Sequence, residues 1–429
     1  MKHVKWLIIV FICAVTTVNL SCSRNVFDQE KYQEIIDSLS PVDTIDPNHD
    51  WILNASKVLI VNVPEIENVE RIQVLTANPR EEGDAEIVGE AFVSSGDRVT
   101  MSISYPKIVS TLYVAAVDEE GYYTISSFAP ATTSIINFDE VIVDHEKISY
   151  EPQPQQFTYC FEEEYPQPGD YDYNDVVVRI AQKRTGEKEM RFDVQLAAVG
   201  GMKQLAACIR LIDYKYDDIE SVKTVDDLSF NKSANGKEIA DQMLVVLKDK
   251  SVFLRGRNNE AVINLFVDAH WATGDLLDEN YGVMTRKKYN VANSSGGDYQ
   301  MMVPRKISYV VTFKNASDLN NLSMDKIDPF IIEEYNGGFF EVHTYIHRSA
   351  QVLNPYPTSP VRGLPWALSV PSSNFCWPLE GVNMGFLMKK ATFGAYQTMG
   401  HSFGHWAMDQ TKALDWYLFP SETRVFRFN

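Results

Sequence analysis

One short acidic segment carries the residues best suited to chemistry. Residues 169–175 read Gly-Asp-Tyr-Asp-Tyr-Asn-Asp, directly after a proline and directly before a strongly β-forming run. Three carboxylates and one amide can turn their oxygens toward one point here, from Asp170, Asp172, Asn174 and Asp175. Hard oxygen ligands at this density suit Ca²⁺, which accepts a flexible geometry, better than Mg²⁺. The sequence therefore predicts a calcium site at these four residues.

The segment is not an EF-hand, and a second interpretation stays open. Asp175 stands where an EF-hand needs glycine, and Ala181 stands where it needs glutamate. In the alternative, the same side chains cap backbone N–H groups in a solvated turn. Gathering Asp170, Asp172 and Asp175 without a cation would raise their pKa values at a cost in stability, which favours the metal.

The rest of the chain shows no signature of a familiar catalytic site. It has no G-x-S-x-G elbow, no Walker loop and no dinucleotide fingerprint. Acidic residues such as Asp268 and Asp275 could pair for glycoside cleavage, but sequence does not give the separation that this mechanism requires. We therefore expect that the protein is not an enzyme.

Cysteines and tryptophans each allow two interpretations. Cys160, Cys208 and Cys376 lie in apolar contexts without C-x-x-C spacing, which favours buried thiols, although a Cys160–Cys208 disulfide remains open. Most tryptophans lie in the second half of the chain. Exposed, they would form a sugar-stacking platform; buried, they would form core, which we favour.

The first residues resemble an export and lipidation signal. Lys2 and Lys5 precede an apolar run over 6–18, which is too short to span a membrane. Ser21 before Cys22 resembles the bacterial lipobox, in which the cysteine carries the lipid. We expect a signal peptide over 1–21, lipidation at Cys22 and a polar tether over 22–50. Cleavage without lipidation and an uncleaved anchor are the alternatives.

From residue 51 onward, the sequence pattern predicts β structure, which must hold the acidic segment in place. Short β-rich runs, bounded by Asn, Pro, Gly or Asp, recur along the chain and are typical of all-β domains. We expect a mostly β fold with few helices. The predicted parts are an N-terminal β-sandwich domain over 51–128, a connector over 129–156, and a larger β-sandwich or jelly-roll-like domain over 157–429.

Charge excludes one class of partner. The chain has 58 acidic and 39 basic side chains among 429 residues, giving a formal charge of −19. Such an acidic protein repels the phosphates of nucleic acids. We expect no nucleic-acid partner.

The acidic segment also resembles a known family. The run 169–178, preceded by Phe161-Glu162-Glu163, resembles the opening signature of the LruC domain, also catalogued as a DUF4842-type domain of unknown function. This β-rich domain occurs in secreted lipoproteins of Bacteroidetes and spirochaetes. The resemblance covers 157–420, but the family has no established activity to transfer. Its C-terminal pattern is matched by Leu364-Pro365-Trp366-Ala367-Leu368, Pro378-Leu379-Glu380-Gly381 and Asp415-Trp416-Tyr417.

These observations give one leading function and two others. We expect an outer-membrane lipoprotein of the cell envelope, anchored by its lipid and exposed at the cell surface, whose calcium-stabilised β domain binds a glycan or a surface protein. A structural or adhesive role in a surface assembly is the first alternative. An extracellular glycan hydrolase is the second. The sequence leaves open the ligand, the oligomeric state, and whether the protein faces the periplasm or the cell exterior.

Overall fold

Strands dominate the structure, and its helices are few and short, as predicted. The computed structural model describes residues 45–81, 83–138, 147–163, 165, 169–232, 236–274, 286–292, 299–344, 364–384 and 401–428. The predicted signal peptide and Cys22 lie outside these residues. Residues 41–429 form one compact unit, so the division at 128 and 157 stays a prediction. Within the described ranges, no helix has the length and apolarity needed to cross a membrane.

The first eight strands form two sheets, with strand orders β4-β1-β7 and β6-β5-β2-β3-β8. Alternation of side chains explains β1: Leu59 and Val61 are fully buried in the core that the two sheets share, whereas Val58, directly before Leu59, is 55% exposed. The bounds are β1 (Asn54–Asn62), β2 (Val69–Leu75), β3 (Glu86–Phe92), β4 (Arg98–Pro106), β5 (Leu112–Asp118), β6 (Tyr123–Phe128), β7 (Ile135–Ile136) and β8 (Gln153–Pro154).

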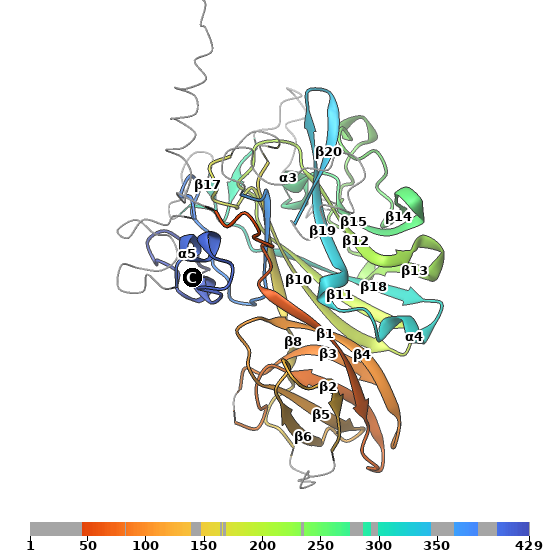
Figure 1. Ribbon diagram of the computed structural model, residues 1–429. Helices are drawn as coiled ribbons and strands as arrows, with labels where there is room; N and C mark the ends of the chain where they lie inside the picture. Colours follow the sequence, from red (N-terminus) through yellow and green to blue (C-terminus); the bar gives the residue numbers. More distant parts are fainter. Residues whose placement is uncertain are drawn as a thin grey trace, which may run out of the picture. The chain divides into compact units, whose positions relative to one another are not determined.

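The remaining strands form a six-stranded sheet, β13-β18-β11-β10-β9-β21, a five-stranded sheet, β14-β15-β12-β19-β20, and the pair β16-β17 (Figure 1). The bounds are β9 (Gln156–Phe161), β10 (Val176–Gly186), β11 (Glu189–Ala198), β12 (Ala206–Lys215), β13 (Ile219–Thr224), β14 (Phe253–Arg255), β15 (Glu260–Phe266), β16 (Lys288–Tyr289), β17 (Tyr299–Gln300), β18 (Arg305–Phe313), β19 (Ile327–Tyr335), β20 (Gly338–His343) and β21 (Ala367–Val370).

Helices in the described residues are single turns or little more. The α-helices are α3 (Ala269–Ala272), α4 (Ala316–Leu319) and α5 (Phe403–Met408). The 3₁₀ turns are η1 (Tyr216–Asp218), η2 (Val225–Asp227), η3 (Asp241–Met243), η4 (Arg257–Asn259), η5 (Met324–Lys326) and η8 (Trp416–Leu418).

The sandwich and jelly-roll part of the prediction is wrong. A jelly roll places eight strands in two Greek keys, whereas the described strands divide among five sheets of two to six strands. The chain changes sheet between consecutive strands, as from β11 to β12 and from β18 to β19. Strand-forming runs predict that strands exist. Which strands pair depends on contacts between distant residues, which the runs do not encode.

Two hydrophobic clusters lie on opposite faces of the six-stranded sheet. Val176 and Val178 of β10 face the large core that is shared with the sheet β14-β15-β12-β19-β20. Val177 faces a second cluster, which is formed with the C-terminal segment. All six tryptophans in the described residues are buried, which confirms their expected role as core: Trp51, Trp271, Trp366, Trp377, Trp406 and Trp416.

The three cysteines in the described residues, Cys160, Cys208 and Cys376, are free thiols, so the Cys160–Cys208 disulfide is not formed. Cys160 belongs to the C-terminal cluster on the outer face of the six-stranded sheet. Cys208 belongs to a small cluster on the outer face of the five-stranded sheet. The large core separates the two thiols, and burial raises the pKa of both. Buried, protonated thiols of this kind are unreactive.

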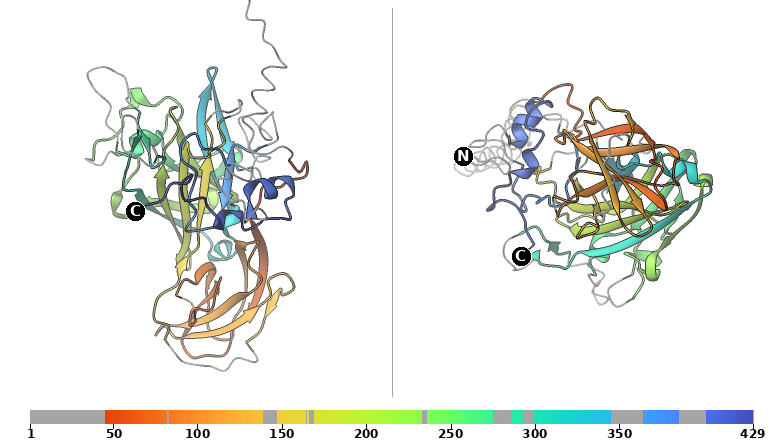
Figure 2. Two further views of the ribbon diagram at one scale, coloured as in Figure 1. Left: turned by 90° about the vertical axis from the view of Figure 1, so that its left-hand side faces the viewer. Right: turned by 90° about the horizontal axis from the view of Figure 1, so that it is seen from below.

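The segment before β1 is fixed to α5, as both views in Figure 2 show. The Asp46 N–H donates to the Ala407 carbonyl at 3.0 Å, and the His49 ring contacts the Trp406 carbonyl at 2.8 Å. The His49 ring also stacks on Trp51. The two ends of the described chain therefore share one cluster, which the sequence order does not reveal.

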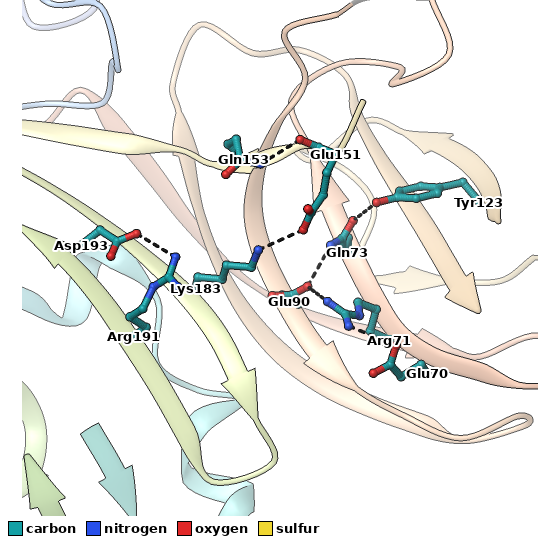
Figure 3. Close-up of polar contacts among 10 residues, drawn as sticks. All are labelled: Glu70, Arg71, Gln73, Glu90, Tyr123, Glu151, Gln153, Lys183, Arg191 and Asp193. Carbon is teal, nitrogen blue, oxygen red and sulfur yellow. Dashed lines mark hydrogen bonds and ion pairs between the residues drawn. The ribbon is translucent and has the colours of Figure 1, made fainter. Parts of the chain in front are cut away.

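A network of buried polar side chains stabilises the five-stranded sheet β6-β5-β2-β3-β8 (Figure 3). The Tyr123 hydroxyl donates to the Gln73 side-chain oxygen at 3.0 Å. The Gln73 amide in turn donates to Glu90 at 2.8 Å, and Arg71 pairs with the same carboxylate. Burial raises the pKa of Tyr123 to about 12. The phenol is therefore a permanent hydrogen-bond donor at physiological pH.

A buried ionic cluster lies on the outer face of the other five-stranded sheet. Arg210 of β12 stands opposite Asp328 of β19, and the guanidinium donates to this carboxylate at 2.6 and 3.0 Å. His343 of β20 contacts Asp328 at 2.9 Å and Glu341 at 3.1 Å. Burial alone lowers the pKa of His343, but these two carboxylates outweigh burial and the opposing Arg210 charge, so the pKa is raised.

We predict a pH dependence of stability from His343. Because its pKa is raised in the folded state, its contribution is complete below about pH 6.5, the unfolded value, and is lost as the pH rises through the folded value. The free energy of unfolding, measured by urea titration between pH 5 and 9, should fall across this window. The His343→Gln variant should lose this slope, and an unchanged slope would contradict the assignment.

Candidate metal centre

The acidic segment connects β9 to β10, and the pairing of these strands closes it. Phe161, the last residue of β9, stands opposite Val176, the first residue of β10. Glu162 and Asp175 therefore begin and end a loop whose two arms are held together by the sheet. The Glu163 N–H donates to the Asp175 carboxylate at 2.7 Å, which closes the base of the loop.

Two tyrosines set the backbone of this loop. Tyr171 and Tyr173 have positive φ values of 58° and 53°, which side chains other than glycine adopt only at a cost. Both rings are buried in the C-terminal cluster. The Tyr173 hydroxyl donates to the Pro365 carbonyl at 2.9 Å, and the Tyr171 carbonyl accepts from the Met384 N–H at 2.9 Å. Packing against the C-terminal segment thus stabilises a strained conformation.

Three carboxylates converge in the loop. Oxygen atoms of Glu162, Asp170 and Asp172 lie within 4.8 Å of one another. Glu162 and Asp172 are each 1% exposed, whereas Asp170 reaches the surface. Glu162 accepts the Tyr173 N–H at 2.6 Å through one oxygen. Its other oxygen is buried and has no hydrogen-bond partner among the described residues.

A second pair of acceptor oxygens lies beside Gly200. The Asn174 amide donates to the Pro378 carbonyl at 3.1 Å, which fixes the orientation of the amide. Its oxygen is buried without a partner in the described structure, and so is one oxygen of Glu380. A Cβ placed on Gly200 would overlap the Asn174 oxygen and lie 3.0 Å from the Glu380 oxygen. Gly200 therefore leaves the space that these two oxygens need.

Backbone contacts link the two oxygen groups. The Asp172 carboxylate accepts the Asn174 N–H at 3.1 Å and the Gly381 N–H at 2.7 Å. Residue 381 directly follows Glu380, so Asp172 joins the loop to the segment that carries this fourth carboxylate. The cluster therefore draws on two regions far apart in the chain.

Electrostatics at the cluster are unfavourable for carboxylates alone. Burial raises the pKa of Glu162 well above its usual range, and the neighbouring Asp170 charge adds to the effect. Burial and the charges of Glu162, Asp170 and Glu380 do the same to Asp172. Lys288 of β16 forms an ion pair with the other oxygen of Glu380. One lysine offsets only part of the negative charge of four acids, so a divalent cation would stabilise this arrangement.

The structure brings together part of the sequence-predicted set and adds to it. Asp170 and Asp172 supply oxygens to the three-carboxylate cluster, and Asn174 supplies one to the pair beside Gly200. Asp175 belongs to neither oxygen group. Its carboxylate accepts the Glu163 N–H, and burial and the Glu163 charge raise its pKa. Sequence reasoning missed Glu162 and Glu380. Glu162 adjoins the motif and could have been included, whereas nothing near Glu380 signals a ligand.

We predict that Gly200→Ala disrupts this centre. The added methyl group would overlap the Asn174 oxygen and approach its carbonyl oxygen at 2.9 Å, and backbone cannot yield as a side chain can. The free energy of unfolding in urea, followed by tryptophan fluorescence, should fall by roughly 1–3 kcal/mol. Gly83→Ala is the control, because no atom lies within 4 Å of its Cβ position. Equal effects in the two variants would count against the proposed packing.

Comparisons with known proteins identify the family of this chain and a solved structure with a similar fold. No curated protein matches it. A solved structure, described as that of a candidate lipoprotein from Bacteroides ovatus, is 16% identical with a TM-score of 0.51, and the match covers 85% of this chain and 100% of the other. At this identity the likeness shows the fold alone. The family model "Domain of unknown function (DUF4842)" matches residues 188–417, which include Gly200, Lys288 and Glu380. The chain belongs to this family.

Proposed function

We propose that this protein is a non-catalytic, lipid-anchored module of the cell envelope whose β fold is organised by a calcium ion. The ligands would be oxygens of Glu162, Asp170, Asp172, Asn174 and Glu380. One observation carries the proposal: three buried acceptor oxygens, on Glu162, Asn174 and Glu380, have no donor among the described residues. A bound cation satisfies such oxygens, whereas a capped turn leaves them at the full cost of desolvation.

Calcium fits the ligand set better than magnesium. Magnesium requires a near-octahedral geometry and keeps several water molecules, while calcium accepts many protein oxygens in an irregular arrangement. Glu162, Asp172 and Asn174 are buried, so few water molecules could complete a magnesium shell. Asp175 has a separate role in this proposal, because its hydrogen bond to the Glu163 N–H closes the loop.

The ion would join two distant segments. Four of the proposed ligands lie in the loop between β9 and β10, and Glu380 lies in the C-terminal segment that covers the outer face of the six-stranded sheet. Calcium would thus fix that cover to the sheet. A stabilising ion of this kind suits a protein exposed to the millimolar calcium outside the cell, where weak sites are filled.

The envelope location is supported by residues 1–22, which resemble a lipoprotein signal, and by the description of the similar Bacteroides ovatus structure as a candidate lipoprotein. Placement in the outer membrane and at the cell surface is part of the same proposal. Its function there would be to bind a surface glycan or protein. The buried tryptophans do not supply a stacking platform for that ligand.

The structural alternative is favoured by one specific observation. β20 forms an edge of its sheet and carries Phe339, which is 40% exposed. An exposed edge with an apolar side chain can accept a strand from another protein. The hydrolase alternative gains nothing from Asp268, whose carboxylate caps α3 by accepting the Trp271 N–H at 3.1 Å.

We predict that calcium raises the stability of the full chain in detergent. At a hundredfold excess over the dissociation constant, calcium should add about 2.7 kcal/mol to the free energy of unfolding, relative to the same protein with chelator. Asp172→Asn and Glu380→Gln should lose most of this increase. Glu65→Gln, which removes an exposed carboxylate elsewhere, should keep it. If the parent protein gains no stability with calcium, the loop is a capped turn.

A further inference from the structure

A groove of about 440 Å³ opens on the outer face of the six-stranded sheet, and its lining includes no residue of the acidic loop. Arg179 of β10 forms one side, and segments 372–377 and 417–428 form the others. Leu418 and Phe428 remain 52% and 40% exposed, so the groove has an accessible apolar wall. Its volume lies in the range of sites for small ligands.

The charge of this groove is opposite to that of the whole protein. Its lining includes two arginines, Arg179 and Arg427, and no aspartate or glutamate. In a chain with 58 acidic and 39 basic side chains, this is a local reversal. Arg427 pairs at 3.5 Å with Glu422, but both side chains are largely exposed, and such pairs contribute little. The groove therefore presents net positive charge.

Arg179 has unused hydrogen-bond donors in the described structure. Its one hydrogen bond in the described structure runs from Nη2 to the Phe375 carbonyl at 2.8 Å, and its buried Nε has no partner there. The guanidinium lies 5.2 Å from the Trp377 ring centre and 5.8 Å from that of Phe428. Burial lowers the pKa of Arg179, and no carboxylate counteracts this effect.

Two other buried or half-buried arginines in the described structure have more partners than Arg179. Arg305 donates to three carbonyl groups, those of Ser229, Lys232 and Ala272. Arg210 donates twice to Asp328. Arg179, by contrast, has one hydrogen bond and no carboxylate partner among the described residues. A planar guanidinium is the side chain best suited to a carboxylate, which it can bind with two hydrogen bonds.

We propose that this groove binds a carboxylate carried on a sugar ring, such as a hexuronate residue of an acidic glycan. Arg179 and Arg427 would bind the carboxylate, Phe428 and Leu418 would contact the apolar face of the ring, and Asn374 would meet its hydroxyl groups. This assignment rests on the proposed binding function and names its ligand class. It does not depend on the calcium ion.

Calorimetric titration of the full chain in detergent tests the proposal, with calcium present and again with chelator. Glucuronate should bind in both conditions, and glucose, which lacks the carboxylate, should bind at least about tenfold more weakly. Binding of glucuronate with calcium but none with chelator would overturn the independence of the two sites. Equal binding of benzoate, acetate and glucuronate would overturn the sugar assignment, leaving a simple anion site.

Variants assign the binding to the groove. Arg179→Gln should weaken glucuronate binding about tenfold or more, and Arg427→Gln, at an exposed position that does not threaten folding, should weaken it several-fold. Arg98→Gln is the control, because it removes the same charge from an exposed site on β4. Unchanged affinity in the Arg427 variant, or an equal loss in the Arg98 variant, would overturn the proposal. A failure of glucuronate binding alongside intact calcium stabilisation would leave the calcium proposal standing.

Discussion

The burial of acceptor oxygens without donors is the constraint on which the rest of this structure depends. Glu162, Asn174 and Glu380 each place an oxygen in the interior where no N–H or O–H reaches it within the described structure. An oxygen lost to water in this way costs free energy unless another group replaces the water. The neighbouring carboxylates add repulsion, so the local energy balance favours a cation over further hydrogen bonding.

The elements around this cluster are arranged to keep it closed. The pairing of Phe161 with Val176 fixes the two arms of the acidic loop. Gly200 provides room for the facing oxygens, and the Gly381 N–H bonds to Asp172. Two tyrosines hold unfavourable backbone angles because their rings are buried in the C-terminal cluster. The site and that cluster therefore stabilise each other.

The six-stranded sheet acts as the common support. One face of β10 contributes to the large core, and the other face is covered by the C-terminal segment with its tryptophans. The acidic cluster lies at one place along this cover, and the positively charged groove lies at another. The alternation of side chains along β10 sends neighbouring residues to opposite faces of the sheet. Both sites, which have opposite charge, lie along the cover on the outer face.

Local sequence determined that the chain forms strands, that its tryptophans lie in the core, and that Asp170 and Asp172 bring their carboxylates together. Each of these follows from residue type and short spacing. Tertiary structure decided the rest: the division into five sheets, the separation of Cys160 from Cys208, and the arrival of Glu380 beside Asn174. These features depend on which distant segments pack together. Local sequence patterns do not show which segments a long connection will bring into contact.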